Sequence, residues 1–137
     1  MSEKSHKAIE LELPAAPPSV AAARHLVDAF ARDCDVADPF SVRAAVSEAI
    51  GNVVAHAYPN RSPGPVRLEA ECTSSQVRVT VEDEGTGMRV SNTPGLGVGL
   101  KLMRKLADEM VVKDRRGRGL RIEFRFDRRS STPPVLV

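Results

Sequence analysis

The sequence predicts one domain of the α/β class: a two-layer sandwich in which helices cover one face of a mixed, mostly antiparallel sheet. Runs that alternate between apolar and polar residues, typical of half-buried strands, are separated by segments whose apolar residues recur at helical spacing. In chain order the elements are β-α-α-β-β-α-β-β, and the simplest packing for that order places the helices in one layer against one sheet. The chain of 137 residues is long enough for one domain with its own core.

The first half of the chain is predicted to form a strand and two helices. Residues 7–13 alternate, and prolines follow them. Residues 19–33 and 39–58 have helical spacing, and Pro39 suits a helix entrance. The apolar positions that define these patterns are Ile9, Leu11 and Leu13 in the strand, Ala22, Leu26, Ala29 and Phe30 in the first helix, and Val42, Val46, Ala49 and Val53 in the second.

The second half is predicted to form two hairpins with a helix between them. Residues 66–72 and 77–82 both alternate and make the first hairpin. Residues 97–110 make the helix, and residues 111–126 make the second hairpin around a turn at 115–119. The apolar stripe of this helix consists of Leu100, Met103, Leu106 or Ala107, and Met110.

The domain is assigned to residues 1–127, and residues 128–137, which include Ser-Ser-Thr-Pro-Pro, are predicted to be a disordered tail. A content of 42% hydrophobic and 28% charged residues is ordinary for a soluble globular protein. The first 13 residues contain no apolar segment typical of a secretion signal, and no stretch reaches the roughly 18 apolar residues of a membrane span. We therefore expect a cytoplasmic protein without membrane contact, in which Cys34 and Cys72 are reduced thiols.

The charge and aromatic content argue against direct nucleic-acid binding. The net charge is only +2, and the chain has one Tyr and no Trp with which to stack bases. Arginines crowd the C-terminal quarter of the chain. The simpler interpretation is a solvated strand face and turn, and the alternative is a surface for an acidic partner or phosphate.

A carboxylate and an amide stand one turn apart on the predicted second helix. Glu48, Asn52 and His56 lie within about 80° of one another on a helical wheel, on the flank of the buried stripe. An Asn carbonyl oxygen is a good ligand for Mg²⁺, and a Glu one turn earlier can act as a general base. The alternative is a surface i,i+4 pair, with His56 as a cation at the C-terminus of the helix.

Two glycine-rich segments follow. Asp83 stands at the end of a strand, and Gly85 and Gly87 permit a tight turn and the close approach of a flat ligand, against which Met88 can pack. A buried Asp there can accept a hydrogen bond from an exocyclic amine such as that of adenine. The second segment opens a helix and can bind an anion through its backbone amides; it consists of Gly95, Leu96, Gly97, Val98, Gly99 and Leu100. Each segment has an ordinary structural explanation when it stands alone, but a metal-bound nucleotide needs all three chemistries together.

These three motifs resemble the GHKL, or Bergerat, ATP-binding fold that gyrase, histidine kinases and MutL share. The run from Val46 to Asn52, continued by His56-Ala57-Tyr58, resembles more specifically the small anti-sigma-factor serine kinases of the SpoIIAB and RsbW type. This resemblance implies a protein that binds Mg-ATP, holds a sigma factor inactive and phosphorylates a serine of an anti-anti-sigma protein of the STAS-domain type. It also implies a homodimer.

The resemblance assigns roles to individual residues. Asn52 corresponds to the Mg²⁺ ligand, Glu48 to the general base, and Asp83 to the adenine contact, with His56 and the two glycine segments completing the ATP site. Arg24 resembles an arginine that such proteins use at partner interfaces. Two departures concern catalysis: residues 88–94 make a short ATP lid, and Leu120 follows Gly119 where the family tends to have Thr.

Three functions remain open on these residues. The first is the anti-sigma factor with serine kinase activity. The second is a non-catalytic or weakly catalytic ATP-gated partner-switching module, which the short lid and Leu120 favour. The third is a detached catalytic domain of a histidine kinase, which needs a separate protein that carries the phosphoacceptor histidine.

Overall fold

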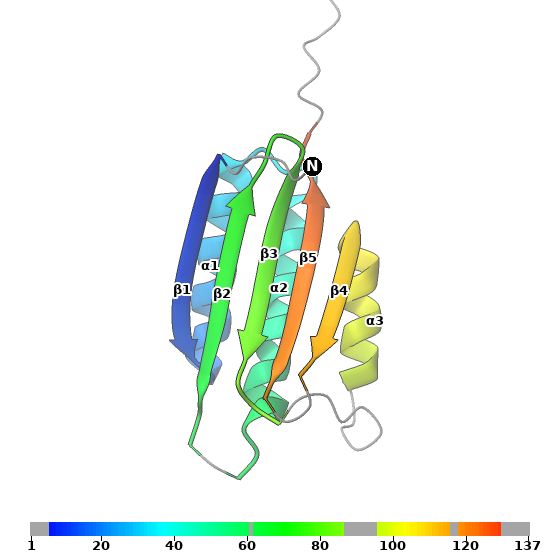
Figure 1. Cartoon of the computed structure of the whole chain (residues 1–137). Coiled ribbons are helices and arrows are strands. Elements are labelled where there is room, and N and C mark those ends of the chain that lie inside the picture. Colours follow the sequence, from blue (N-terminus) through cyan, green and yellow to red (C-terminus); the bar gives the residue numbers. More distant parts are fainter. Residues whose placement is uncertain (1–5, 61, 87–95, 116–117, 130–137) are drawn as a thin grey trace, which may run out of the picture.

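The computed structural model describes residues 6–60, 62–86, 96–115 and 118–129. Its centre is one five-stranded sheet in the order β1-β2-β3-β5-β4 (Figure 1). The strands are β1 (Lys7–Pro14), β2 (Pro65–Cys72), β3 (Gln76–Asp83), β4 (Glu109–Asp114) and β5 (Leu120–Asp127). The element order and the two-layer α/β fold are as predicted. Every pair of neighbouring strands is antiparallel, so the sheet is not mixed.

All three helices lie on the same face of the sheet (Figure 1). They are α1 (Pro17–Asp33), α2 (Pro39–Asn52) and α3 (Leu96–Leu106). The core fills the space between the two layers, and its largest fully buried side chains include Phe124, Ile50, Leu68 and Met103. Cys34 and Cys72 are buried and free, as expected from the sequence. No helix in the described ranges is long and apolar enough to cross a membrane.

The buried face of α1 differs from the predicted one. The helix begins at Pro17, two residues earlier than expected, because prolines are tolerated in a first turn whose N–H groups have no partner within the helix. Of the predicted stripe, Phe30 is buried, whereas Ala22, Leu26 and Ala29 face solvent. The other buried positions of this helix are Ser19, Ala23, Val27 and Ala31. Small residues at these positions suit the close packing of α1 on α2.

The second helix is shorter than predicted and changes its hydrogen-bond pattern. Asp38 caps α2 by accepting from the Ser41 backbone N–H at 3.3 Å. The predicted stripe of Val42, Val46, Ala49 and Val53 is fully buried. After Asn52, however, the chain forms a π-helical turn, η1 (Val53–Ala57). Because a π-helix has i→i+5 bonds, the helical wheel does not extend to His56.

The third helix also ends before its predicted boundary. It stops at Leu106, and Met110, which was expected on the helix, lies in β4. The chain turns at Ala107, and the Asp108 backbone N–H already donates to the Arg125 carbonyl of β5 at 3.0 Å. Pairing with β5 therefore competes with the helical pattern before β4 formally begins at Glu109.

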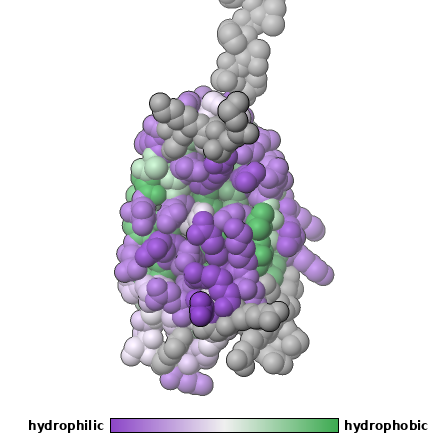
Figure 2. All heavy atoms as spheres, in the orientation of Figure 1, coloured by the Kyte–Doolittle hydropathy of each residue, from purple (hydrophilic) through white to green (hydrophobic). Residues whose placement is uncertain are grey.

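The middle of the open face of the sheet is polar, with apolar patches toward its two side edges (Figure 2). It has a hollow of about 590 Å³ lined mainly by charged residues of four strands. Neighbouring strands pair opposite charges on this face, as in Arg78 of β3 with Glu71 of β2 at 3.0 Å and Arg121 of β5 with Glu82 of β3 at 3.0 Å. The arginines of β5 thus lie on a charged strand face, which agrees with the simpler interpretation of their clustering.

One arginine ties two separate turns to the end of β5. The Arg128 guanidinium donates to the carbonyl oxygens of Cys34 at 2.6 Å, Thr73 at 2.7 Å and Ser74 at 3.3 Å. It therefore ties the end of β5 to the α1–α2 turn and to the β2–β3 turn. Arg128 and Arg129 belong to the predicted tail, and residues 130–137 of that tail lie outside the described residues.

We expect Arg128→Ala to lower the free energy of unfolding by about 2–3 kcal/mol, because the carbonyl oxygens lose a charged donor. Urea denaturation measures this loss. Arg129→Ala is the matched control, since the exposed Arg129 bonds Asp35 through its backbone N–H and should change stability by less than about 0.5 kcal/mol. Equal effects of the two variants would contradict the role of the Arg128 guanidinium.

Candidate functional site

The first and third of the predicted segments meet where α2 passes the N-terminal turn of α3. A Cβ atom built on Gly99 would lie 3.1 Å from Asn52 Nδ2, 3.5 Å from Asn52 Oδ1 and 3.4 Å from Glu48 Oε2. The carboxylate and the amide therefore lie together against the first turn of α3. The i,i+4 spacing of Glu48 and Asn52 thus places both side chains beside the first turn of α3.

The second segment is joined to the first through Ala57, the last residue of η1. The Thr86 backbone N–H donates to the Ala57 carbonyl at 3.0 Å. Gly85 packs so closely on the same carbonyl that an added Cβ would lie 2.1 Å from its oxygen. A larger residue at position 85 would therefore push the glycine turn away from the end of η1.

Asp83 lies at the buried end of β3, with its side chain among backbone donors. Its Oδ1 accepts from Gly85 N at 2.8 Å and from Leu120 N at 3.3 Å. Only 3% of the residue is exposed. Burial raises the pKa of the Asp83 carboxyl above its usual range, although these two N–H groups and the Arg115 charge oppose the rise. The structure therefore places a fixed carboxyl group between the end of β3 and the start of β5.

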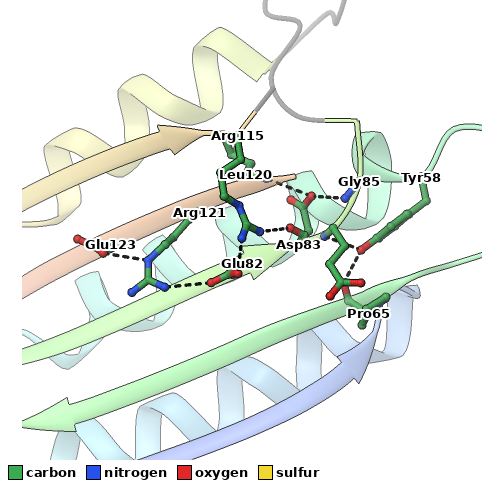
Figure 3. A network of polar contacts seen from close by, with 10 residues as sticks. Tyr58, Pro65, Glu82, Asp83, Gly85, Arg115, Leu120, Arg121 and Glu123 are labelled. Atoms are coloured by element: carbon green, nitrogen blue, oxygen red, sulfur yellow. Dashed lines mark hydrogen bonds and ion pairs between the residues drawn. The ribbon is translucent and has the colours of Figure 1, made fainter. Parts of the chain in front are cut away.

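Two further residues hold the main chain at Asp83, on opposite sides (Figure 3). The Arg115 guanidinium donates to the Asp83 carbonyl oxygen at 2.8 Å and pairs with Glu82 at 2.8 Å. The Tyr58 hydroxyl accepts from Glu84 N at 2.9 Å and donates to the Pro65 carbonyl. The sequence did not indicate a contact of either residue with Asp83. Tyr58 follows the first motif directly, so its position was a usable signal, whereas Arg115 is one of several arginines in the same region.

The turn between β4 and β5 fits against Asp83 only because Gly119 is a glycine. Its φ of +111° favours glycine, and an added Cβ would lie 1.9 Å from the Asp83 carbonyl oxygen. This close packing brings the Leu120 backbone N–H within reach of Asp83. The side chain of Leu120 itself offers no hydroxyl at this position.

The donor set near α3 fits a magnesium ion that is bound through phosphate. Within the described residues no cluster of three or more His, Cys, Asp or Glu side chains exists that could hold a metal by itself. Mg²⁺ commonly takes one or two protein oxygens and completes its shell with water and phosphate oxygens. Asn52 Nδ2 is buried and has no hydrogen-bond partner within the described ranges, so this amide donor is available to an acceptor such as a phosphate oxygen, while Oδ1 of the same amide is the atom that can ligate the metal.

Several predicted residues remain outside this geometry. Gly87, Met88 and Gly95 lie outside the described residues, and for Leu96, Gly97 and Val98 only the helical backbone is described. Leu100 is half-buried on α3, and His56 is half-buried in η1. Arg24 is half-buried on α1 and makes no hydrogen bond or ion pair with the described residues of the three segments. The structure therefore brings together Glu48, Asn52 and Gly99 at one end and Asp83 and Gly85 at the other.

Comparison with known proteins agrees with this arrangement. Residues 13–126 match the family model described as a histidine kinase-like ATPase domain. A protein named anti-sigma F factor from Clostridium beijerinckii is 30% identical over 132 residues, which cover 86% of this chain and 92% of the relative. Proteins of the same name from Clostridium novyi and Pasteuria penetrans are 31% and 30% identical, over 73% and 81% of this chain and 80% and 84% of the relatives. The three-helix, five-strand fold, the site between α2, α3 and β3, and these matches together show that the chain belongs to the histidine kinase-like ATPase domain family.

Proposed function

We propose that this protein is an ATP-binding anti-sigma factor that sequesters a sigma factor and phosphorylates a serine of an anti-anti-sigma protein of the STAS-domain type. The observation that carries the proposal is the contact of Glu48 and Asn52 with the first turn of α3 at Gly99. A carboxylate, an amide oxygen and free backbone amides at one place are the groups that a Mg-triphosphate and its acceptor need. The relatives named anti-sigma F factor support the choice of partner.

At the phosphate end, each group has a distinct task. The Asn52 carbonyl oxygen would hold Mg²⁺, which neutralises charge on the β- and γ-phosphates. The backbone amides at the start of α3 would bind the phosphate oxygens. Glu48 would accept the proton of the acceptor serine while the serine oxygen forms a bond to the γ-phosphorus. The bond from that phosphorus to the bridging oxygen breaks, and ADP leaves. The products are ADP and phosphoserine, and the serine proton is left on Glu48.

At the base end, Asp83 would accept a hydrogen bond from the exocyclic amine of adenine. The glycine turn at Gly85 packs closely against η1, and the ring would stack beside this turn. Because Asp83 is buried, its carboxyl group would accept the hydrogen bond of the ligand in a low-dielectric environment, in which such a bond is stronger than in water. We place the protein in the cytoplasm, acting as a homodimer without direct contact to nucleic acid or membrane.

A specific observation favours a second candidate, a partner-switching module with weak or no catalysis. Leu120 lies beside Asp83 at the position where the anti-sigma-factor serine kinases that this chain resembles tend to have Thr. Leu120 reaches the carboxyl group through its backbone N–H and offers no side-chain hydroxyl. Phosphoryl transfer depends on positioning and charge stabilisation more strongly than nucleotide binding does. Quantifying phosphoserine against time with a STAS-domain acceptor distinguishes the two candidates.

We expect Asn52→Ala to weaken ATP binding in the presence of Mg²⁺ by about 10–100-fold, the scale of one interaction with a charged group. Calorimetry with and without Mg²⁺ measures this loss. Gly51→Ala is the control on the same helix, because an added Cβ meets no atom within 4 Å. It should leave affinity unchanged and stabilise the helix by about 0.5–1 kcal/mol. Unchanged Mg²⁺-dependent affinity in Asn52→Ala would contradict the role of Asn52.

We expect Glu48→Gln to keep ATP binding and to slow phosphoryl transfer to serine by roughly 10²–10⁴-fold, because a general base is lost. Single-turnover formation of phosphoserine, with enzyme in excess over the acceptor, measures the chemical step apart from product release. A variant that phosphorylates at the wild-type rate would remove Glu48 from catalysis.

We expect Asp83→Asn to lose ATP affinity by about 10–100-fold without losing stability at neutral pH. Asn can still accept from Gly85 and Leu120, but it replaces the second carboxylate oxygen with an amide donor.

Burial raises the pKa of Asp83 in the folded protein, so its carboxyl group favours folding below the unfolded pKa and this contribution disappears as the pH rises through the folded pKa. The variant should therefore gain stability relative to wild type from acidic to neutral pH in urea denaturation. A relative loss over that range would contradict the assigned direction of the shift.

A further inference from the structure

Arg115 contacts the candidate base pocket through both its side chain and its main chain. One guanidinium nitrogen donates to the Asp83 carbonyl oxygen at 2.8 Å, and another pairs with Glu82 Oε1 at 2.8 Å. The backbone N–H of Arg115 also donates to the Gly119 carbonyl at 3.0 Å and closes the β4–β5 turn. The side chain and main chain of one residue thus fix both the end of β3 and the turn that faces it.

The peptide group between Asp83 and Glu84 is held at both of its polar atoms. Arg115 bonds the carbonyl oxygen on one side, and the Tyr58 hydroxyl bonds the Glu84 N–H on the other (Figure 3). Holding this peptide restricts the backbone torsions on both sides of it, at Asp83 and at Glu84. These torsions help to place the Asp83 carboxyl group near the Gly85 N–H, which donates to Asp83 Oδ1.

The charge of Arg115 acts on the same carboxyl group. The charged and titratable groups around Asp83 in the described residues are Glu82 and Glu84 in its own segment, Arg115 from the β4–β5 turn and Tyr58 from the end of η1. Arg115 lowers the pKa of Asp83, whereas burial and the neighbouring Glu82 raise it. The guanidinium therefore favours the ionised form, which accepts hydrogen bonds most strongly.

We propose that Arg115 is the positioning residue of the base pocket, which holds Asp83 in the orientation and charge state that bind the exocyclic amine of adenine. The proposal rests on the proposed function, because it names the ligand of the same site. Leu120 offers no side-chain hydroxyl near Asp83, and among the described residues of the β4–β5 turn Arg115 supplies a polar side-chain contact with Asp83.

Arg121 provides a matched control on the next strand. Its guanidinium pairs with the other oxygen of the same Glu82 carboxylate at 3.0 Å and with Glu123 at 2.9 Å. Its described contacts do not include Asp83. Arg115→Gln and Arg121→Gln therefore both remove a cation from Glu82, but only Arg115→Gln removes the contact with the Asp83 carbonyl.

The test has two measurements on the full-length protein. The first follows the carbon-13 carboxyl resonance of Asp83 against pH without nucleotide, assigned with Asp83→Asn. We expect Arg115→Gln to raise the pKa of Asp83 and Arg121→Gln to leave it nearly unchanged. The second measures Mg-ATP affinity against pH by calorimetry. We expect Arg115→Gln to bind about tenfold more weakly at neutral pH, with the acidic loss of affinity moved to higher pH.

Arg115→Lys tests the geometry separately from the charge. An ammonium keeps the positive charge but cannot span the Glu82 carboxylate and the Asp83 carbonyl as a guanidinium fork does. Its affinity should be intermediate, with the acidic limb near that of wild type, and this variant decides the matter if Arg115→Gln does not fold. Wild-type affinity and pH profile in Arg115→Gln, or equal changes in Arg115→Gln and Arg121→Gln, would overturn the proposal. If wild type binds no ATP at any pH, the proposed function fails, while the first measurement still decides whether Arg115 controls Asp83.

Discussion

The burial of the Asp83 carboxyl group is the constraint on which the rest of the site depends. A carboxylate out of water needs donors in fixed places, and here they come from the residue two positions later and from the start of a different strand. The second donor is available only because β5, not β4, lies directly beside β3. Gly119 then removes the last obstacle, since any side chain there would meet the Asp83 carbonyl. The buried Asp83 carboxyl group therefore receives both of its hydrogen bonds only with this strand order and with a glycine at position 119.

The two ends of the site are joined by one continuous helical element. α2 presents Glu48 and Asn52 to the start of α3, and η1, which follows directly, presents the Ala57 carbonyl to the glycine turn. The separation between the metal end and the base end is therefore set by a helix packed into the core, because Val46, Ala49 and Val53 are all buried. Groups fixed on such an element keep their geometry better than groups carried by loops.

The sequence was sufficient for those features that depend on local spacing. The i,i+4 pair Glu48 and Asn52, the strand end at Asp83 and the element order could all be predicted, because each follows from a period of 3.6 or 2. The buried face of α1 could not be predicted in full. The large apolar Leu26 suggested one face of the helix, whereas smaller residues such as Ala23 and Ala31 form the face that packs. Arg115 could not be distinguished from its neighbouring arginines either, because its role depends on a contact with a strand 32 residues away in sequence.

The π-helical turn imposes a requirement on chain length. An i→i+5 turn contains one residue more than the corresponding α-turn, so it corresponds to a single-residue insertion that the helix has absorbed. Deleting one residue between Val53 and Ala57 would rotate everything after it relative to Asn52 while leaving the buried side chains similar in character. The Ala57 carbonyl would then no longer face Thr86. In a lineage of related sequences, this segment should therefore tolerate exchange of one apolar residue for another far more readily than a change in residue count.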